Sequence, residues 1–128
     1  MEIVKKRIEE RNKVICEAKK FVCSLKGKYT AFLIGSYARG DFSIGSDVDI
    51  LLIGEFEDKN PLKRLLNLDF PAGYEVIPLT EQEFLTALEN KNPITWDVVN
   101  ECVILRDDFG LANKIKFYKF KKINSLRN

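Results

Sequence analysis

Apolar residues in the first 26 positions recur at intervals of three and four, and lysine and arginine fill many of the positions between them. The apolar positions are Val4, Ile8, Ile15, Ala18, Val22 and Leu25. This spacing places them on one face of a helix and predicts a long amphipathic helix over residues 2–26. Gly27 is well suited to end that helix. We expect the basic face to be a solvated surface, with guidance of a phosphate-bearing ligand as the alternative.

Short apolar runs bounded by glycine, serine or proline predict the strands of a small sheet. Residues 31–34 and 48–53 form two such runs, with several β-branched residues between turn-forming neighbours. Residues 74–79 predict a third strand, in which Pro78 marks the end or an exposed edge. Residues 102–105 predict an edge strand.

The remaining segments predict further helices. Thr80 and Glu83 have the spacing of a capping box and open a helix that carries Phe84, Leu85 and Leu88. Proline is suited to the first turn of a helix, and it opens two more of the predicted helices. The predicted ranges are residues 62–68, 81–89, 93–100 and 109–126.

Together these segments predict an α/β (α+β) fold with a small mixed sheet and helices packed mainly on one face. The 128 residues are enough for one domain with its own core, so we expect a single domain over residues 1–128. The core would occupy residues 1–105, followed by the helix at 109–126. In that last helix Phe117, Phe120 and Ile123 form either a partner surface or ordinary core packing.

The amino-acid composition excludes several kinds of catalytic and metal site. The chain has no histidine, which excludes Ser-His and Cys-His nucleophile systems and histidine-ligated zinc. Its three cysteines lack metal-site spacing and are expected to be reduced, buried thiols. We expect a cytoplasmic protein with no membrane association, because the N-terminus lacks a signal peptide and no apolar run approaches the length of a membrane span.

The candidate chemistry lies between the first two predicted strands. Asp47 and Asp49 are two residues apart on a strand, so their side chains project from the same face. Two adjacent carboxylates resist ionising together unless a cation lies between them, and Mg²⁺ is commonly held by carboxylates and substrate phosphates. The bland alternative is a pair of aspartates that cap a turn at the start of the strand.

The segment before these aspartates predicts a phosphate site. Gly35 allows a ligand to approach the backbone closely, and Ser36 offers a hydroxyl and an amide at the start of a short helical turn. Gly40 is expected to end that turn. Phosphate-binding groups and metal-binding carboxylates would then converge from adjacent strands, which is the outline of a nucleoside triphosphate site.

These residues carry a resemblance to a known family. Residues 35–41, GSYARGD, followed by residues 46–50, SDVDI, resemble the signature of the minimal nucleotidyltransferases of the DNA polymerase β-like superfamily. The resemblance implies the fold of that superfamily and a third carboxylate on the strand beside the two aspartates. Glu75 occupies the matching place. Its alternative role is that of a charged residue facing water on an edge strand.

The resemblance also implies a reaction. A nucleoside monophosphate, AMP from ATP, would pass to a hydroxyl acceptor with two Mg²⁺ ions, for which Mn²⁺ could substitute. Asp47 and Asp49 would share both metals, while Glu75 would hold the catalytic ion and help to deprotonate the acceptor. The phosphates would contact Ser36 and the backbone of Gly35, with a further charge-assisted contact from Arg39.

The acceptor follows from the resemblance rather than from any residue. Minimal members of the family pair with helical HEPN proteins and act as antitoxins by adenylylating or occluding them. The alternative is a nucleotide-binding module without turnover that acts by forming a complex, and Glu75 decides between these functions. A nucleic-acid partner, bound by the lysine-rich first and last helices, is disfavoured by the net charge of +2 and by the acids among the lysines of the first helix.

Overall fold

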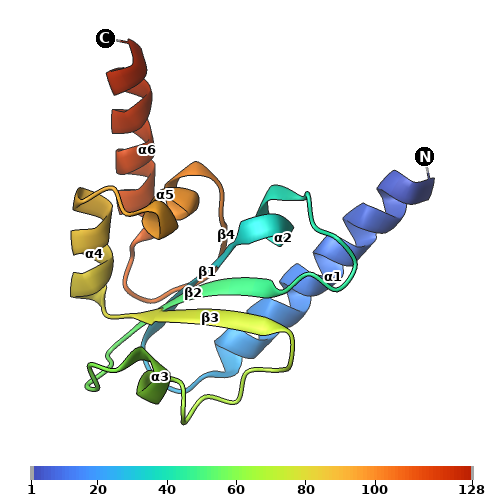
Figure 1. Ribbon diagram of the computed structural model, residues 1–128, viewed down its shortest axis with the longest axis horizontal. Helices are drawn as coiled ribbons and strands as arrows, with labels where there is room; N and C mark the ends of the chain where they lie inside the picture. The colour runs from blue at the N-terminus through green and yellow to red at the C-terminus, as the bar shows by residue number, and fades with distance from the viewer. Residues whose placement is uncertain (1, 128) are drawn as a thin grey trace.

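A four-stranded mixed sheet forms the centre of the fold (Figure 1). We describe a computed structural model over residues 2–127, with side chains through residue 122. The strands lie in the order β3-β2-β1-β4. β1 pairs antiparallel with both β2 and β4, while β3 pairs parallel with β2. Their bounds confirm the predicted strands to within two residues: β1 Tyr29–Ile34, β2 Val48–Gly54, β3 Tyr74–Leu79 and β4 Val103–Asp107.

The helices begin where the local sequence signals predict. Thr80 caps α4 in a complete capping box with Glu83, and Asn92 caps α5 through a bond to the amide of Ile94. The predicted helix over residues 62–68 is shorter than expected, because its leucines at 62 and 66 remain exposed and find no surface to cover. The helices are α1 Glu2–Ser24, α2 Gly35–Arg39, α3 Pro61–Arg64, α4 Glu81–Glu89, α5 Pro93–Asn100 and α6 Ala112–Arg127.

The predicted fold class is confirmed, but helices cover both faces of the sheet rather than mainly one. The reason is that β1 and β2 are apolar on both sides, so each face needs a cover. Leu33 and Ile50 pack in a core cluster with α1 and α2. Phe32 and Leu51 point the other way, into a cluster with α4, α5 and the start of α6.

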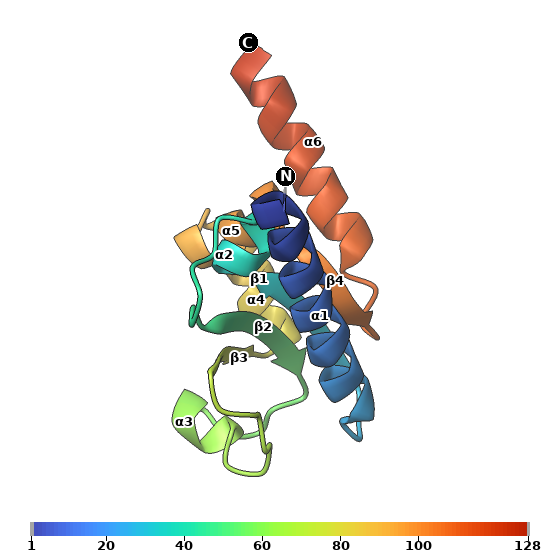
Figure 2. The same ribbon diagram turned by 90° about the vertical axis from the view of Figure 1, so that its right-hand side faces the viewer.

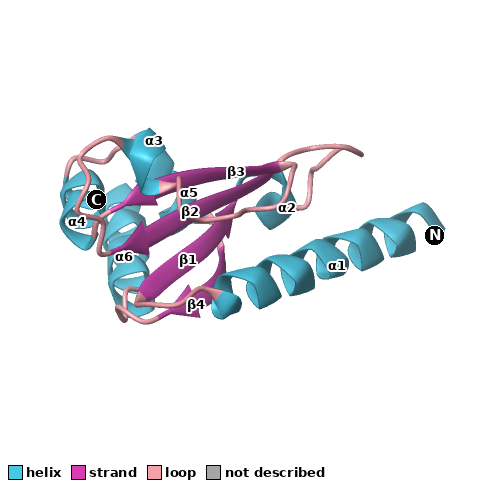
Figure 3. Cartoon of the chain, turned by 90° about the horizontal axis from the view of Figure 1, so that it is seen from below, coloured by secondary structure: helices cyan, strands magenta, loops and turns pink. Residues whose placement is uncertain are grey.

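The first turns of α1 extend beyond the strands, as Figures 1 and 3 show. The predicted apolar face is therefore only partly buried: Val14, Ala18 and Val22 pack on the sheet, whereas Val4 is 57% and Ile8 56% exposed. The thiols of Cys16 and Cys23 are also exposed on this helix, not buried as predicted. Both corrections have one cause, since a helix longer than the sheet has no partner for its outer surface.

At the other end of the chain, α6 rises away from the sheet (Figure 2). Leu111 and Ile115 anchor its start in the core, but Phe117 is 61% and Phe120 64% exposed. Core packing is therefore not the role of these two phenylalanines, while Ile123 lies outside the described side chains. No helix in the described part of the chain is long and apolar enough to cross a membrane.

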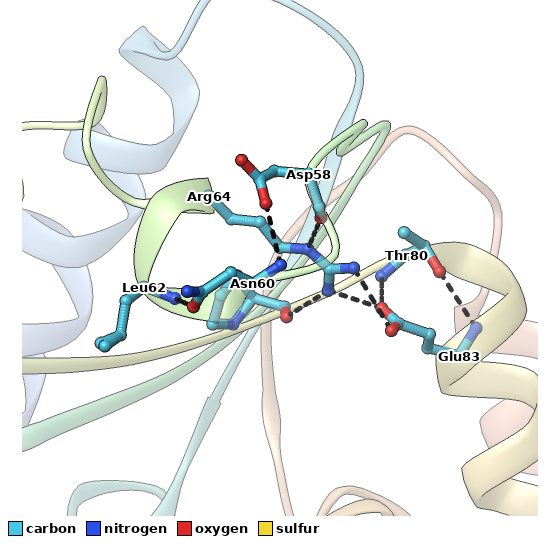
Figure 4. A network of polar contacts seen from close by, with 7 residues as sticks. Asp58, Asn60, Leu62, Arg64, Thr80 and Glu83 are labelled. Carbon is cyan, nitrogen blue, oxygen red and sulfur yellow. Dashed lines mark hydrogen bonds and ion pairs between the residues drawn. The ribbon is translucent and has the colours of Figure 1, made fainter.

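Two guanidinium groups, one buried on Arg64 and one partly buried on Arg106, join distant segments. Arg64 bonds to the carbonyl oxygens of Asp58 at 2.6 Å and Pro78 at 3.1 Å and to Oε1 of Glu83 at 2.6 Å, which ties α3 to β3 and α4 (Figure 4). Arg106 donates to the carbonyls of Val22 and Leu25 at the end of α1, each at 2.8 Å. Both use a planar fork of donors to satisfy carbonyls that local structure leaves free.

Candidate active site

Three predicted site carboxylates lie at the starts of β2 and β3. The parallel pairing places Asp49 directly beside Glu75 in register. Val48 points into the core on the α1 side, so Asp49 projects from the opposite face, as does Ile77 two residues beyond Glu75 on β3. Asp49 is half-buried, whereas Asp47 and Glu75 are exposed. The sheet therefore brings Asp49 and Glu75 together, with Asp47 nearby on the approach to β2.

The electrostatics of this group centre on Asp49. Burial, followed by the negative charge of Glu75 and a hydrogen bond with it, raises the pKa of the Asp49 carboxyl to about 6. The charge of Asp47 raises this pKa further, while Arg39 acts in the opposite direction. A carboxyl group whose pKa is raised by burial and by neighbouring carboxylates is the expected signature of a site prepared for a cation.

Gly35 fits closely against this acidic group. It begins α2 with φ +76°, a backbone conformation that side chains with a Cβ rarely adopt. A Cβ added to Gly35 would lie 2.2 Å from Oδ2 of Asp49. Glycine is thus required twice, for the turn from β1 into α2 and for the approach of that turn to the carboxylate.

The glycine–serine loop, residues 35–46, carries the groups that are predicted to bind phosphate. Ser36 stands in the first turn of α2, and its carbonyl accepts bonds from the amides of Gly40 at 2.8 Å and Asp41 at 3.1 Å. Gly40 ends the helix in the left-handed conformation, as predicted. Arg39 is exposed and forms an ion pair with Asp41 at 3.1 Å, so its guanidinium already has a partner beside the site.

The donor set suits a hard divalent cation in kind. Carboxylate oxygens from two neighbouring strands meet at Asp49 and Glu75, and the raised pKa of Asp49 reflects burial and then the negative charge of Glu75, which a cation would relieve. Within the described residues, no three acidic, cysteine or histidine side chains are gathered closely enough to form a metal-binding group. Asp47 would need to move toward the other two to complete one.

Two arginines of α1, which the sequence did not single out, hold the glycine–serine loop. Arg11 donates to the carbonyls of Tyr37 at 2.7 Å and Ala38 at 2.8 Å. Arg7 donates to the carbonyls of Gly40 at 3.0 Å and Phe42 at 2.7 Å. The sequence predicted a solvated basic face on this helix. It could not reveal these contacts, because a guanidinium that binds distant backbone carbonyls leaves no local pattern.

Comparison with known proteins places the chain among nucleotidyltransferase sequences. A family profile described as a nucleotidyltransferase domain matches residues 15–127. A Methanocaldococcus jannaschii protein, provisionally named a protein adenylyltransferase, is 36% identical in an alignment of 72 residues that covers 52% of this chain and 72% of that protein. The profile match includes the glycine–serine loop and all three carboxylates, whereas Arg7 and Arg11 precede it.

One solved structure supports the fold, and a second is similar over more of the chain with a lower TM-score. A crystal structure from Sulfolobus solfataricus, provisionally named a nucleotidyltransferase, superposes with a TM-score of 0.54 at 23% identity, covering 77% of this chain and 84% of that chain. A toxin–antitoxin crystal structure with AMP-PNP has a TM-score of 0.44 at 17% identity, covering 91% and 86% of the two chains. The first of these supports the mixed α/β architecture described above.

Proposed function

This chain belongs to the nucleotidyltransferase domain family, and on that premise we propose that it transfers AMP from ATP to a protein hydroxyl with the help of divalent metal ions. The observation that carries the proposal is the meeting of Gly35 with the Asp49–Glu75 pair. A turn that presents backbone amides lies directly against carboxylates whose charge a cation would relieve. Phosphate and metal are the two things that such a juxtaposition can bind at once.

The proposed step is a displacement at the α-phosphorus of the nucleotide. The acceptor oxygen forms a bond to that phosphorus while the bond to the oxygen bridging the α- and β-phosphates breaks, and pyrophosphate leaves. The proton of the acceptor hydroxyl passes to a carboxylate of the site, and Glu75, exposed at the start of β3, is the proposed recipient. A carboxylate in reach of the attacking hydroxyl acts here as a general base.

Asp47, Asp49 and Glu75 are the proposed ligands of the metal ions. Bound Mg²⁺, or Mn²⁺ in its place, would neutralise charge on the phosphoryl oxygens and activate the acceptor oxygen. Because the pKa of the Asp49 carboxyl is raised to about 6, a cation that binds below that pH must displace a proton from this group. The side chain of Asp47 is exposed, so turning it toward the other two would disturb no core packing.

Gly35, Ser36 and Arg39 are the proposed contacts of the triphosphate. Gly35 and Ser36 begin α2, where no side chain caps the first amides, so these amides can donate to phosphate oxygens. Arg39 would exchange its exposed ion pair with Asp41 for a phosphate, which costs little because both partners are solvated.

A protein acceptor is the finer part of the proposal. It is supported by the provisional name of the Methanocaldococcus jannaschii relative. The sequence resemblance to minimal nucleotidyltransferases adds a HEPN toxin as the proposed partner, so that AMP transfer to its tyrosine hydroxyl would be the action of an antitoxin. Exposed Phe117 and Phe120 on α6 offer one surface for such a partner.

A second function, nucleotide binding without turnover, is favoured by one observation. The described residues hold no preassembled group of three metal-binding side chains, and Glu75 is exposed. In that case the protein would act by forming a complex, and ATP would serve as a bound ligand.

Two labelled forms of ATP separate these functions. The protein is incubated with Mg²⁺ and extract of its source organism, with label in either the α- or the γ-phosphate. Transfer of the α label alone to a protein, lost in Asp47→Asn/Asp49→Asn but kept in Asp69→Asn, supports nucleotidyl transfer; Asp69 lies in an exposed loop, and its substitution makes the same chemical change as each of the two site substitutions. Transfer of the γ label contradicts the mechanism. Metal-dependent ATP binding without transfer supports the binding module.

A further inference from the structure

The helix that carries the proposed phosphate contacts is too short to hold its own position. α2 has five residues, and an isolated helix of that length is unstable in water. Its last carbonyls have no partners within the helix. Something outside the glycine–serine loop must therefore keep Gly35 and Ser36 in place beside Asp49.

The outside support comes from α1, which contacts the end of α2, whereas Asp49 lies against its start. Arg11 spans two consecutive carbonyls, of Tyr37 and Ala38, with Nε and Nη2. Arg7 uses Nη2 to bridge the carbonyls of Gly40 and Phe42. Four carbonyls, two in the last turn of α2 and two just beyond it, are thus held by two side chains one helical turn apart.

Aromatic packing strengthens the same junction. The guanidinium of Arg7 lies over the ring of Phe42 at 4.6 Å, and that ring stacks on Tyr37 with centroids 4.3 Å apart. Both rings are buried. Positive charge at the end of α2 also matches the negative end of a helix dipole, which favours this placement further.

The length of α1 fits this role better than a packing role. Residues 2–10 are exposed, and the first buried residue of the helix is Val14. The outer turns therefore add little to the core. What they contribute in contacts is Arg7 and Arg11, which reach back to the loop.

We propose that Arg7 and Arg11 are positioning residues, which fix the glycine–serine loop from α1 so that its amides face the nucleotide while Asp49 bounds its other end. This inference rests on the proposed function, because the groups positioned are the proposed phosphate contacts. Both arginines precede residues 15–127, the part that matches the family profile, so this support comes from a part of the chain outside the matched domain. Neither guanidinium needs to touch the nucleotide.

The test compares Arg7→Gln/Arg11→Gln with Lys13→Gln, which removes a positive charge from an exposed position of the same helix. Arg11→Lys is the conservative variant, since it keeps the charge but not the planar fork that spans two carbonyls. Amide hydrogen exchange is measured over residues 36–42 and over β1 and β2. Initial rates of AMP transfer then give kcat and KM for ATP.

We expect faster exchange in residues 36–42 of the double variant, with β1 and β2 unchanged. We also expect kcat/KM to fall about tenfold or more, chiefly through a higher KM for ATP, because displaced amides bind phosphate poorly. Arg11→Lys should recover part of this loss, and Lys13→Gln should match the wild type. A general loss of folded protein would instead lower kcat and leave KM unchanged.

The inference is overturned if the double variant keeps wild-type exchange in residues 36–42, or if its KM for ATP stays within twofold of the wild type. Failure of the proposed function is separate: the wild type would then neither bind nor transfer the nucleotide. The exchange measurement still decides whether the arginines position the loop in that event.

Discussion

Gly35 and Asp49 are in such close contact that a methyl group on the α-carbon of the glycine would collide with the carboxylate of the aspartate. The contact joins the start of α2 to the start of β2, and it fixes how near the proposed phosphate contacts lie to the proposed metal ligands. Any change that separates the two residues moves both halves of the site apart.

Gly35→Ala should abolish nucleotide binding. The new Cβ would lie 2.2 Å from Oδ2 of Asp49, so α2 or the carboxylate must move, and the φ of +76° is strained for alanine. We expect a loss of stability of about 2 kcal/mol or more. Denaturant unfolding and titration with Mg·ATP measure the two effects.

Gly45→Ala is the matched control for this variant. Gly45 has φ +84°, but a Cβ there would meet nothing within 4 Å. It should lose about 1 kcal/mol of stability from backbone strain alone and keep its nucleotide affinity. Equal loss of affinity in the two variants would contradict the importance of the Gly35–Asp49 contact.

Affinity for Mn²⁺ or Mg²⁺ should rise with pH through about 6. Asp49 has its pKa raised to about 6, so protons compete with the metal below that value. Each unit of pH below it should weaken binding up to about tenfold. Calorimetric titration between pH 5 and 8 measures this slope, and Asp49→Asn should lose it. An affinity independent of pH would show that Asp49 is not a ligand.

The same raised pKa predicts that the stability of the metal-free protein falls as the pH rises, whereas the metal affinity increases. The folded protein holds the Asp49 proton more tightly than the unfolded chain, whose ordinary value is 3.8. The stabilising contribution is therefore present below about pH 4 and lost as the pH rises through about 6. Asp49→Asn should be more stable than the wild type by about 1 kcal/mol at pH 7.5, a value reduced for solvent screening, and by much less at pH 4.5. Urea unfolding at both values checks this.

Glu75→Gln should shift the rise of metal affinity with pH to lower pH. The variant removes a negative charge and a hydrogen bond that both raise the pKa of Asp49. AMP transfer should fall by about a hundredfold, because the proposed proton acceptor is lost. Glu75→Asp keeps the charge at the same register position and should retain much of the activity. An unchanged pH profile in Glu75→Gln would contradict the coupling of the two carboxyl groups.

Arg64→Ala should lower the stability by about 2 kcal/mol, because it leaves the buried carbonyl of Pro78 without its donor. Glu83→Gln should cost less, since Glu83 is half exposed and glutamine still accepts a bond from the amide of Thr80. The hydrogen bond from Arg64 lowers the pKa of Glu83, so its contribution is present above the ordinary value of 4.5 and lost as the pH falls below it. Denaturant unfolding of both variants at pH 7 and pH 3.5 measures these differences. Equal losses in the two variants would contradict the role of the Pro78 carbonyl.

Local chemistry made most of this fold predictable. The capping box of Thr80 and Glu83, the proline that opens α5 and the apolar runs of β1 and β2 each act over a few residues. The spacing of the glycine–serine loop from Asp47 and Asp49 was specific enough to indicate the family, which the profile match confirms. The roles of the individual site residues stay predictions.

What the sequence could not predict depends on contacts between distant segments. The exposure of Val4 and Ile8 follows from how far α1 extends past the sheet, which helical spacing does not encode. The bonds of Arg7 and Arg11 join residues separated by 26 to 35 positions, to backbone groups that every residue possesses. Helices cover both faces because strand residues alternate direction in β1 and β2 alike, and both directions are apolar.

The pairing of β2 with β3 also bears on the order in which the molecule folds. β1 and β2 are antiparallel neighbours joined by the short segment that includes α2, whereas β3 must return parallel to β2 through a connection whose only helix has four residues. Parallel pairing over such a connection closes late, because the chain entropy is lost before contacts repay it. Glu75 therefore joins Asp49 only once β3 has docked on β2, so the third carboxylate of the site depends on a strand pairing that the Gly35–Asp49 contact does not need.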